Sequence, residues 1–141
     1  MNIEEALNQF DTKEELIADI DGHLQDLAKE NPDYNYSGCD PEVMSSYHIK
    51  CRYNSGPYDD ETQEFVEGKE SKGCIFGQTL QRMGWDGKFS DDMSGELGIE
   101  YDGIASILNS MSVLDYVDTC RYSEIQSEQD KGVVWGKLIL G

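Results

Sequence analysis

The sequence is short of basic residues. Among its 141 residues, 29 are Asp or Glu and only 11 are Lys or Arg, so the formal net charge is −18 at pH 7. Proteins that bind nucleic acid directly present a basic footprint, and we therefore expect no direct contact with DNA or RNA. No stretch approaches the roughly 18 consecutive apolar residues that a membrane-spanning helix needs. The first residues, Met1 to Glu5, lack the basic start and apolar run of a secretory signal, which predicts a cytoplasmic protein without a membrane partner.

The motifs of common enzymes are also missing. The chain has no G-x-S-x-G elbow, no phosphate-binding P-loop, no H-E-x-x-H zinc motif and no dinucleotide-binding glycine fingerprint. It has two histidines, His23 and His48, which leaves little material for a nucleophile–histidine pair. We therefore predict a protein that is not an enzyme, with no catalytic residue and no cofactor.

Metal sites receive little support from the sequence. Cysteines occur at positions 39, 51, 74 and 120 and form no C-x-x-C pair. In a reducing cytosol we expect free, buried and inert thiols. A zinc site assembled from these cysteines with the two histidines is the alternative. A calcium loop starting at Asp59 fails, because its sixth position holds Glu64 where the sharp turn needs glycine. No metal ligand is predicted.

What the chain does contain is a folded acidic body. Fourteen of its residues are Phe, Trp or Tyr, and a disordered acidic tail would lack such rings. The net charge is −7 over residues 1–30, −5 over 31–72 and −6 over 73–141, so the acids are not concentrated in a terminal tail. We predict a single acidic globular domain over residues 1–141, whose folded surface displays the charge.

Helical patterns dominate the two ends of the chain. Residues 13–30 place apolar side chains at helical spacing, between a capping box at Thr12 and Glu15 and the stop signal Asn31-Pro32. Shorter helices are predicted at 2–10, 74–83 and 101–111, with another inside 113–129, and the apolar residues 133–140 are expected to pack on the body. Residues 47–53 alternate as a strand, which we predict to pair with 62–66 across an acidic loop at 58–61. The predicted class is α+β, a mainly helical single domain with a small β-hairpin.

Four segments resemble a group of small proteins of actinobacteria and their phages. They are Asn31-Pro32-Asp33-Tyr34, Cys51-Arg52-Tyr53, the run from Gly73 to Gly84 and the run from Gln126 to Gly136. That group has no known activity, so the resemblance transfers no catalytic residue. It implies a phage or mobile-element setting, in which small acidic proteins often inhibit host or defence proteins and act in the cytoplasm of the host cell.

From the residues themselves, the same segments indicate structural roles. Gly77 would let a neighbouring backbone approach its helix. Gly132 and Gly136 flank Trp135, which we expect to anchor the C-terminal segment in the core.

The acids themselves supply the candidate site. Four carboxylates of the 13–30 helix fall on one side of the helical wheel, next to the apolar arc: Glu15, Asp19, Asp26 and Glu30. Like charges four residues apart cost about 0.2–0.5 kcal/mol per pair, so a row of one sign suggests a purpose beyond folding. A second acidic stretch between Arg82 and Arg121 contributes Asp91, Asp92 and Glu96. A solvated acidic face with no binding role is the alternative.

These observations favour a binding protein whose partner is basic. We expect an acidic inhibitor of phage type that occupies the nucleic-acid groove of a host or defence protein, as an anti-CRISPR or anti-restriction protein would, by presenting carboxylates in place of phosphates. An immunity or antitoxin-like protein that blocks a basic toxin is the first alternative. A small metal-binding domain is the second.

Overall fold

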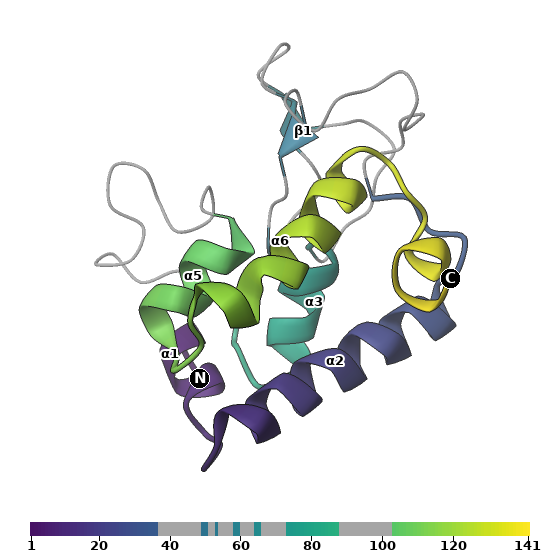
Figure 1. Cartoon of the computed structure of the whole chain (residues 1–141). Coiled ribbons are helices and arrows are strands. Elements are labelled where there is room, and N and C mark those ends of the chain that lie inside the picture. Colours follow the sequence, from purple (N-terminus) through teal and green to yellow (C-terminus); the bar gives the residue numbers. More distant parts are fainter. Residues whose placement is uncertain (37–48, 51–52, 54–57, 60–63, 66–72, 88–102) are drawn as a thin grey trace.

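The structure is a computed structural model that describes residues 1–36, 49–50, 53, 58–59, 64–65, 73–87 and 103–141. Within these residues the chain is built around one long helix, α2. Figure 1 shows α1 and α5 at the N-terminal end of α2 and the C-terminal turn η2 at its other end, with α3 and α6 between them. The hydrophobic side chains of these helices meet in one core.

Helix α2 runs from Lys13 to Glu30, the bounds that the sequence predicts. Thr12 caps it, because the Thr12 hydroxyl oxygen accepts the backbone N–H of Glu15 at 3.2 Å. The predicted capping box is only half formed: the Glu15 carboxylate accepts the N–H of Asp11 at 3.2 Å instead of that of Thr12. At the other end Asn31 stops the helix and donates its side-chain N–H to the Leu27 carbonyl at 3.1 Å. These local signals explain why the helix could be located from sequence.

The remaining helices are shorter. Helix α1 covers Ile3–Leu7, α3 Ile75–Arg82, α5 Ile104–Met111 and α6 Tyr116–Asp130, and a π-helical turn, η2, covers Gly136–Leu140. Both α1 and α6 begin with a complete capping box, formed by Asn2 with Glu5 and by Asp115 with Asp118. Helices α1, α2, α3, α5 and α6 bury side chains in the core, and Leu138 and Ile139 of η2 pack against it, as expected for the C-terminal segment.

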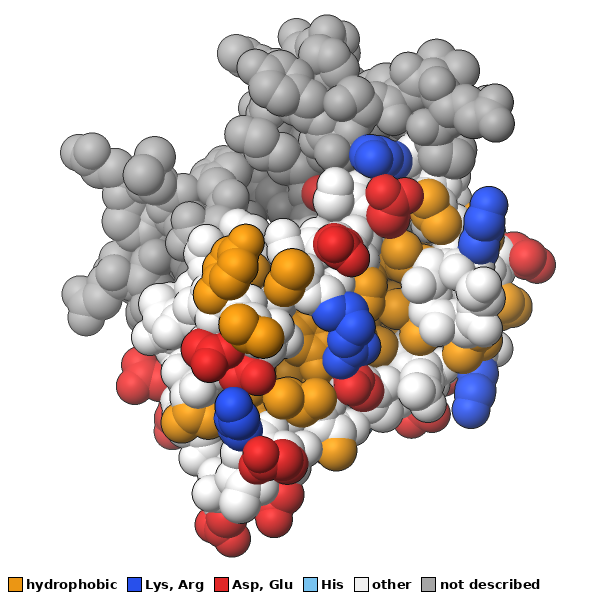
Figure 2. Space-filling model, in the orientation of Figure 1, with side chains coloured by type: hydrophobic (Ala, Val, Ile, Leu, Met, Phe, Trp, Pro, Cys, Tyr) orange, Lys and Arg blue, Asp and Glu red, His pale blue; other side chains and the backbone are white. Residues whose placement is uncertain are grey.

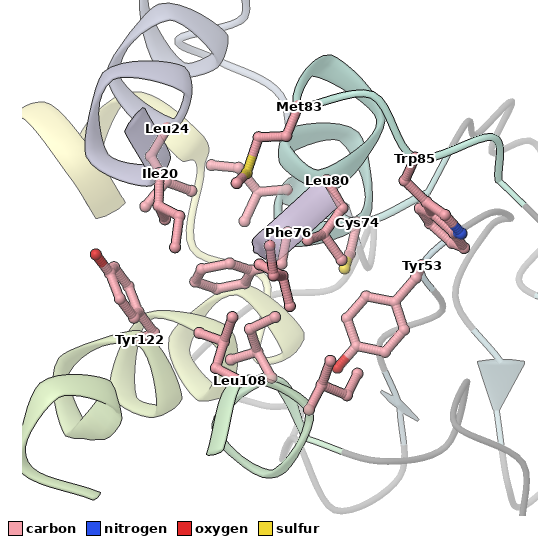
Figure 3. Close-up of a cluster of buried hydrophobic side chains, with 14 of the residues drawn as sticks. Ile20, Leu24, Tyr53, Cys74, Phe76, Leu80, Met83, Trp85, Leu108 and Tyr122 are labelled. Carbon is pink, nitrogen blue, oxygen red and sulfur yellow. The ribbon is translucent and has the colours of Figure 1, made fainter. Parts of the chain in front are cut away.

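The core lies between α2 and the helices packed on it (Figure 3). Ile20 and Leu24 of α2 point toward Phe76 of α3, whose ring meets that of Tyr122 edge-on at 5.9 Å. Leu108 of α5 closes the cluster from the opposite side. Buried apolar side chains of this kind supply most of the free energy that offsets the ordering of the chain.

The segments that carry the resemblance pack against one another. A Cβ atom at Gly77 would lie 1.8 Å from the carbonyl oxygen of Tyr53, so the expected close backbone approach is confirmed. Trp135 is 1% exposed, and its ring meets that of Tyr34 edge-on at 4.7 Å, which confirms its role as an anchor. The N–H of Gly136 donates to the Pro32 carbonyl at 2.9 Å, where a side chain would not fit. The structural roles predicted for Gly77 and Trp135 are thus confirmed.

The predicted fold class is wrong. Ile49–Lys50 (β1) pairs with Tyr58–Asp59 (β2), and β2 in turn pairs with Glu64–Phe65 (β3). The predicted hairpin, which joined 47–53 directly to 62–66 across a loop at 58–61, is therefore not formed. Fragments of two residues are too short to be stable on their own, and the described body of the chain is helical rather than α+β. Its extent as one domain over residues 1–141 stays a prediction.

The expectation for the cysteines is also wrong. Cys74 is disulfide-bonded, and its Sγ accepts the N–H of Gly77 at 3.5 Å. Cys120 is a free thiol, as predicted, but it is exposed instead of buried. Cys39 and Cys51 lie outside the described residues. The sequence argument failed at Cys74 because it inferred the redox state of the thiols from an expected compartment.

Candidate functional site

The four predicted carboxylates of α2 lie along one flank of that helix. We call Glu15, Asp19, Asp26 and Glu30 the α2 acidic flank. Successive members are separated by four, seven and four residues, which corresponds to about 6, 10 and 6 Å along the helix axis. Glu15, Asp26 and Glu30 are exposed and Asp19 is half-buried, because the buried residues of α2 occupy the adjoining arc of the wheel. The flank is therefore reachable from solvent along most of its length.

The sequence suggested a row of charges of one sign, but in the structure a cation lies at one end of the flank. Arg82 of α3 donates from Nη1 to Oε2 of Glu30 at 2.6 Å. This hydrogen bond, with the charge of Arg82 behind it, lowers the pKa of Glu30, and the same bond raises the pKa of Arg82. Asp26 also lies near enough to raise the pKa of Arg82, although less than Glu30 does. The far end of the flank is consequently part-neutralised by a neighbouring helix.

The middle and the start of the flank have weaker partners. Nε2 of His23 lies 3.3 Å from Oδ2 of Asp19, one helical turn away. The carboxylate of Glu15 holds the Asp11 N–H at the start of α2 and therefore has a structural role in addition to its charge. Asp26 forms no ion pair with any residue that the structure describes. Asp19 and Asp26 are the members best placed to meet a partner.

On the opposite flank of α2, the carboxylate of Asp21 bonds two residues of another helix. Both carboxylate oxygens of Asp21 lie 2.9 Å from Nη2 of Arg121 in α6. The hydroxyl of the buried Tyr122 donates to the same carboxylate at 2.9 Å. Burial, and then this hydrogen bond, raises the pKa of Tyr122 far above its ordinary value. Asp21 is thus a structural link between α2 and α6.

A second cross-helix ion pair lies at the start of α2. Nζ of Lys13 lies 3.4 Å from Oδ2 of Asp118 in α6. The backbone bond that Asp118 makes at the α6 cap, and then Lys13, lowers the pKa of Asp118. Lys13 and Arg121 are therefore already bound to carboxylates of the protein.

The charge balance of the described body remains strongly negative. Residues 1–36, 73–87 and 103–141 contain sixteen Asp or Glu and six Lys or Arg. Four of those six cations, namely Lys13, Arg82, Arg121 and Lys131, already bond a carboxylate of the chain. The outward field of this part of the molecule is consequently set by carboxylates.

The other predicted site residues do not contribute to the described site. Asp91, Asp92 and Glu96 lie outside the described residues. Among the residues that are described, no group of three or more His, Cys, Asp or Glu is arranged to hold a metal ion. Within the same residues, no helix combines the length and the apolar character needed to cross a bilayer.

Three apolar side chains that the sequence analysis did not single out are also exposed. Val113, Tyr116 and Val117 are 66%, 75% and 80% exposed; Val113 lies three residues before α6, and Tyr116 and Val117 are its first two residues. Figure 2 shows apolar side chains gathered over this part of the molecule with carboxylates beside them. A helical wheel of residues 116–130 places Val117 opposite Gln126, but Val113 lies before that helix and has no such signal.

No protein-family model, no curated protein and no solved structure matches this chain. The site must therefore be interpreted from its own geometry and charge.

Proposed function

We propose that the protein is an acidic inhibitor that binds a basic, nucleic-acid-binding protein through the α2 acidic flank. The observation that supports this function is the charge balance of the described body, in which carboxylates outnumber cations and most cations are already bound internally. Such a surface attracts a partner that is rich in lysine and arginine and repels nucleic acid.

The flank offers what a groove for nucleic acid recognises. Glu15 and Asp26 lie eleven residues apart on a rigid helix, a span of about 16 Å. One strand of a duplex presents a charge about every 3.4 Å along its axis, so the flank supplies a sparser row of charges over a few nucleotide steps. Complementary fields of this kind raise association rates toward 10⁸–10⁹ M⁻¹s⁻¹ at low salt. The resemblance to proteins of actinobacteria and their phages supports a host or defence protein as the target.

Arg82 of the same chain competes with cations of the partner for one carboxylate of the flank. It holds Glu30 at 2.6 Å, so a cation of the partner must displace Arg82 before it can bind that carboxylate. Asp19 and Asp26 require no such exchange with a lysine or arginine. We therefore assign the larger part of the electrostatic attraction to these two residues.

To test this proposal, the whole chain is used as bait to capture binding partners, and nucleic acid is then added as a competitor. Partners retained by the wild type should be released by duplex DNA or by RNA and by raising salt from 50 to 200 mM, since the ion pairs are screened. Asp19→Asn/Asp26→Asn should slow association with the purified partner. Glu4→Gln/Asp33→Asn is the matched control, because it removes the same charge from exposed positions that are not members of the flank. A partner without a basic groove, or equal rates for both double variants, would refute the proposal.

The disulfide at Cys74 favours the second candidate, an immunity-type protein that blocks a basic toxin. Disulfides persist mainly in oxidising compartments, which fits a toxin met outside the reducing cytosol better than a cytosolic host or defence protein. This candidate uses the same carboxylates but a different target. A purified partner with toxin activity that the wild type inhibits, and nucleic acid does not displace, would select it over the first candidate.

A further inference from the structure

The start of α6 exposes an apolar surface that the folding of the chain does not require. We define the α6 apolar patch as Val113, Tyr116 and Val117, which are 66%, 75% and 80% exposed. The capping box of Asp115 and Asp118 already starts the helix, and other side chains of α6, including the buried Thr119 and Tyr122, face the core. Valine and tyrosine are moderate helix formers, so local propensity does not explain them either.

The patch continues into a groove. Val113 borders an opening of about 270 Å³ between the loop after α1 and the start of α2, whose apolar lining also includes Leu7, Phe10 and Leu16. The polar lining of the same groove includes Asp11 and Lys13. The patch therefore offers both an apolar surface and an adjoining hollow that can receive a side chain.

The rim of the patch is acidic. Asp115 precedes Tyr116 directly, Glu124 lies two helical turns beyond Val117 on the same side of α6, and Asp11 lines the groove. None of these three carboxylates forms an ion pair with a residue that the structure describes. The nearby cations Lys13 and Arg121 are held by Asp118 and Asp21. A partner seated here meets apolar side chains in the centre and unneutralised carboxylates around them.

A second copy of the chain does not suit this surface. Each copy has a net charge of −18, so a symmetric contact would bring two acidic rims together. Stable homodimers also bury large apolar interfaces, whereas the patch consists of three side chains and a small groove.

We propose that the α6 apolar patch is a docking surface for an amphipathic basic segment of a protein partner, a helix with one apolar face flanked by lysine or arginine. Its apolar side chains cover Tyr116 and Val117 and enter the groove beside Val113, and its cations meet Asp11, Asp115 and Glu124. This inference rests on the proposed function and narrows it. The α2 acidic flank attracts the partner, while the patch distinguishes a protein from nucleic acid, which has no amphipathic helix to offer.

Defined peptides test the proposal without knowledge of the natural partner. The probe is a synthetic helical peptide with leucine on one face and lysine on the other, compared with a scrambled peptide of the same composition. Cys120 is exposed and lies one turn beyond Tyr116 and Val117, so an environment-sensitive fluorophore on this thiol reports binding at the patch. Cys120→Ser shows how much label attaches elsewhere, and calorimetry with unlabelled protein gives an independent dissociation constant.

We expect the amphipathic peptide to bind about tenfold more tightly than the scrambled one, because a few buried aromatic and aliphatic contacts dominate interface energies. Tyr116→Ser/Val117→Ser should abolish that preference. Leu140→Ser, which changes an apolar side chain 49% exposed at the C-terminus, should leave it intact. Since the replaced side chains of α6 are largely exposed, the double variant should keep the wild-type circular dichroism spectrum and melting curve.

The proposal fails if the two peptides bind equally, if Tyr116→Ser/Val117→Ser binds like the wild type, or if sedimentation shows a dimer that this variant dissociates. The last result would assign the patch to a second copy. Asp19→Asn/Asp26→Asn separates this inference from the proposed function. A partner that binds this variant as fast as the wild type, yet loses affinity for Tyr116→Ser/Val117→Ser, would refute the flank and leave the patch standing.

Discussion

Polar side chains have different roles in two regions of the molecule. In the α3–α6 junction, formed by Tyr53, Gly77, Gln126 and Gln129, the two glutamines are buried and bond backbone and side-chain groups of neighbouring segments. On the α2 acidic flank, Asp19 and Asp26 reach solvent and bond no lysine or arginine of the described chain. The glutamines of the junction are bonded inside the fold, Gln129 also to the buried Asp130, whereas the flank is charged and open. The difference indicates which residues maintain the fold and which are available to a partner.

The junction supplies caps that the sequence pattern does not show. Helix α5 begins at Gly103 without a side-chain cap of its own, and Oε1 of Gln126 in α6 accepts the N–H of Ile104 at 2.8 Å. Oε1 of Gln129 likewise accepts the N–H of Ile75 at the start of α3, at 2.7 Å. Two helix starts therefore depend on side chains of a third helix, and substitutions in the junction should affect α3, α5 and α6 together.

The largest effect is expected where the junction has no space. Gly77→Ala places a methyl group 1.8 Å from the Tyr53 carbonyl oxygen, a contact with rigid backbone. Overpacking costs typically 1–3 kcal/mol and occasionally more, so we expect at least about 3 kcal/mol lost from the free energy of unfolding in urea. Gly22→Ala in α2 is the matched control. Nothing lies within 4 Å of its added carbon, so it should stabilise by about 0.5–1 kcal/mol. Equal effects of the two changes would contradict the proposed packing of Tyr53 on α3.

The next largest effect concerns the caps. Gln129→Leu replaces the amide with an apolar side chain of similar size and leaves the Ile75 N–H buried without its acceptor. An unsatisfied buried donor costs about 1–3 kcal/mol. Chemical denaturation should show that loss, and amide exchange should become faster at the start of α3. Unchanged exchange at Ile75 would show that this bond is not the cap of α3.

How much of the fold could be predicted from the sequence depends on how far apart in the chain the interacting residues lie. The bounds of α2 were predicted correctly because Thr12, Asn31 and Pro32 act through neighbours a few residues away. The close approach at Gly77 and the anchor at Trp135 were anticipated from residue type. The hairpin was wrong because alternation marks a strand without naming its partner, and β2 lies where a loop was expected.

The candidate site likewise combines features set within one helix, which the sequence predicts, with contacts between helices, which it does not. The wheel of α2 places its four acids correctly on one flank, since that is geometry within a single helix. It could not show that Arg82, 52 residues beyond Glu30, folds back onto the end of that flank. Nor could it show that Asp21 would be held by Arg121, 100 residues away. Cross-helix pairs decide which carboxylates are left for a partner, and they depend on packing that a single sequence does not specify.

A smaller effect should follow from neutralising the flank. Asp19→Asn/Asp26→Asn removes one member of each like-charged pair that is four residues apart, with Glu15 and with Glu30. Each such pair costs about 0.2–0.5 kcal/mol, so the variant should be as stable as the wild type or slightly more stable in low salt. Urea denaturation at 20 and 500 mM salt measures this, and the difference should vanish at the higher salt. A marked loss of stability would place these residues in the scaffold instead of the binding surface.

The smallest expected effect is the loss, at acid pH, of the stability that the Glu30–Arg82 ion pair contributes. Arg82 lowers the pKa of Glu30 below its ordinary value of 4.5. A carboxyl whose pKa is lower in the folded than in the unfolded state stabilises the fold above its unfolded pKa, and this contribution disappears as the pH falls through the folded value. The melting temperature of the wild type should exceed that of Glu30→Gln slightly at pH 6, and the two should converge below the pKa of Glu30. Because both side chains are exposed, the margin should also shrink with salt. A margin that stayed constant down to pH 2 would mean that the ion pair does not form in solution, and the flank would then regain a fourth free carboxylate.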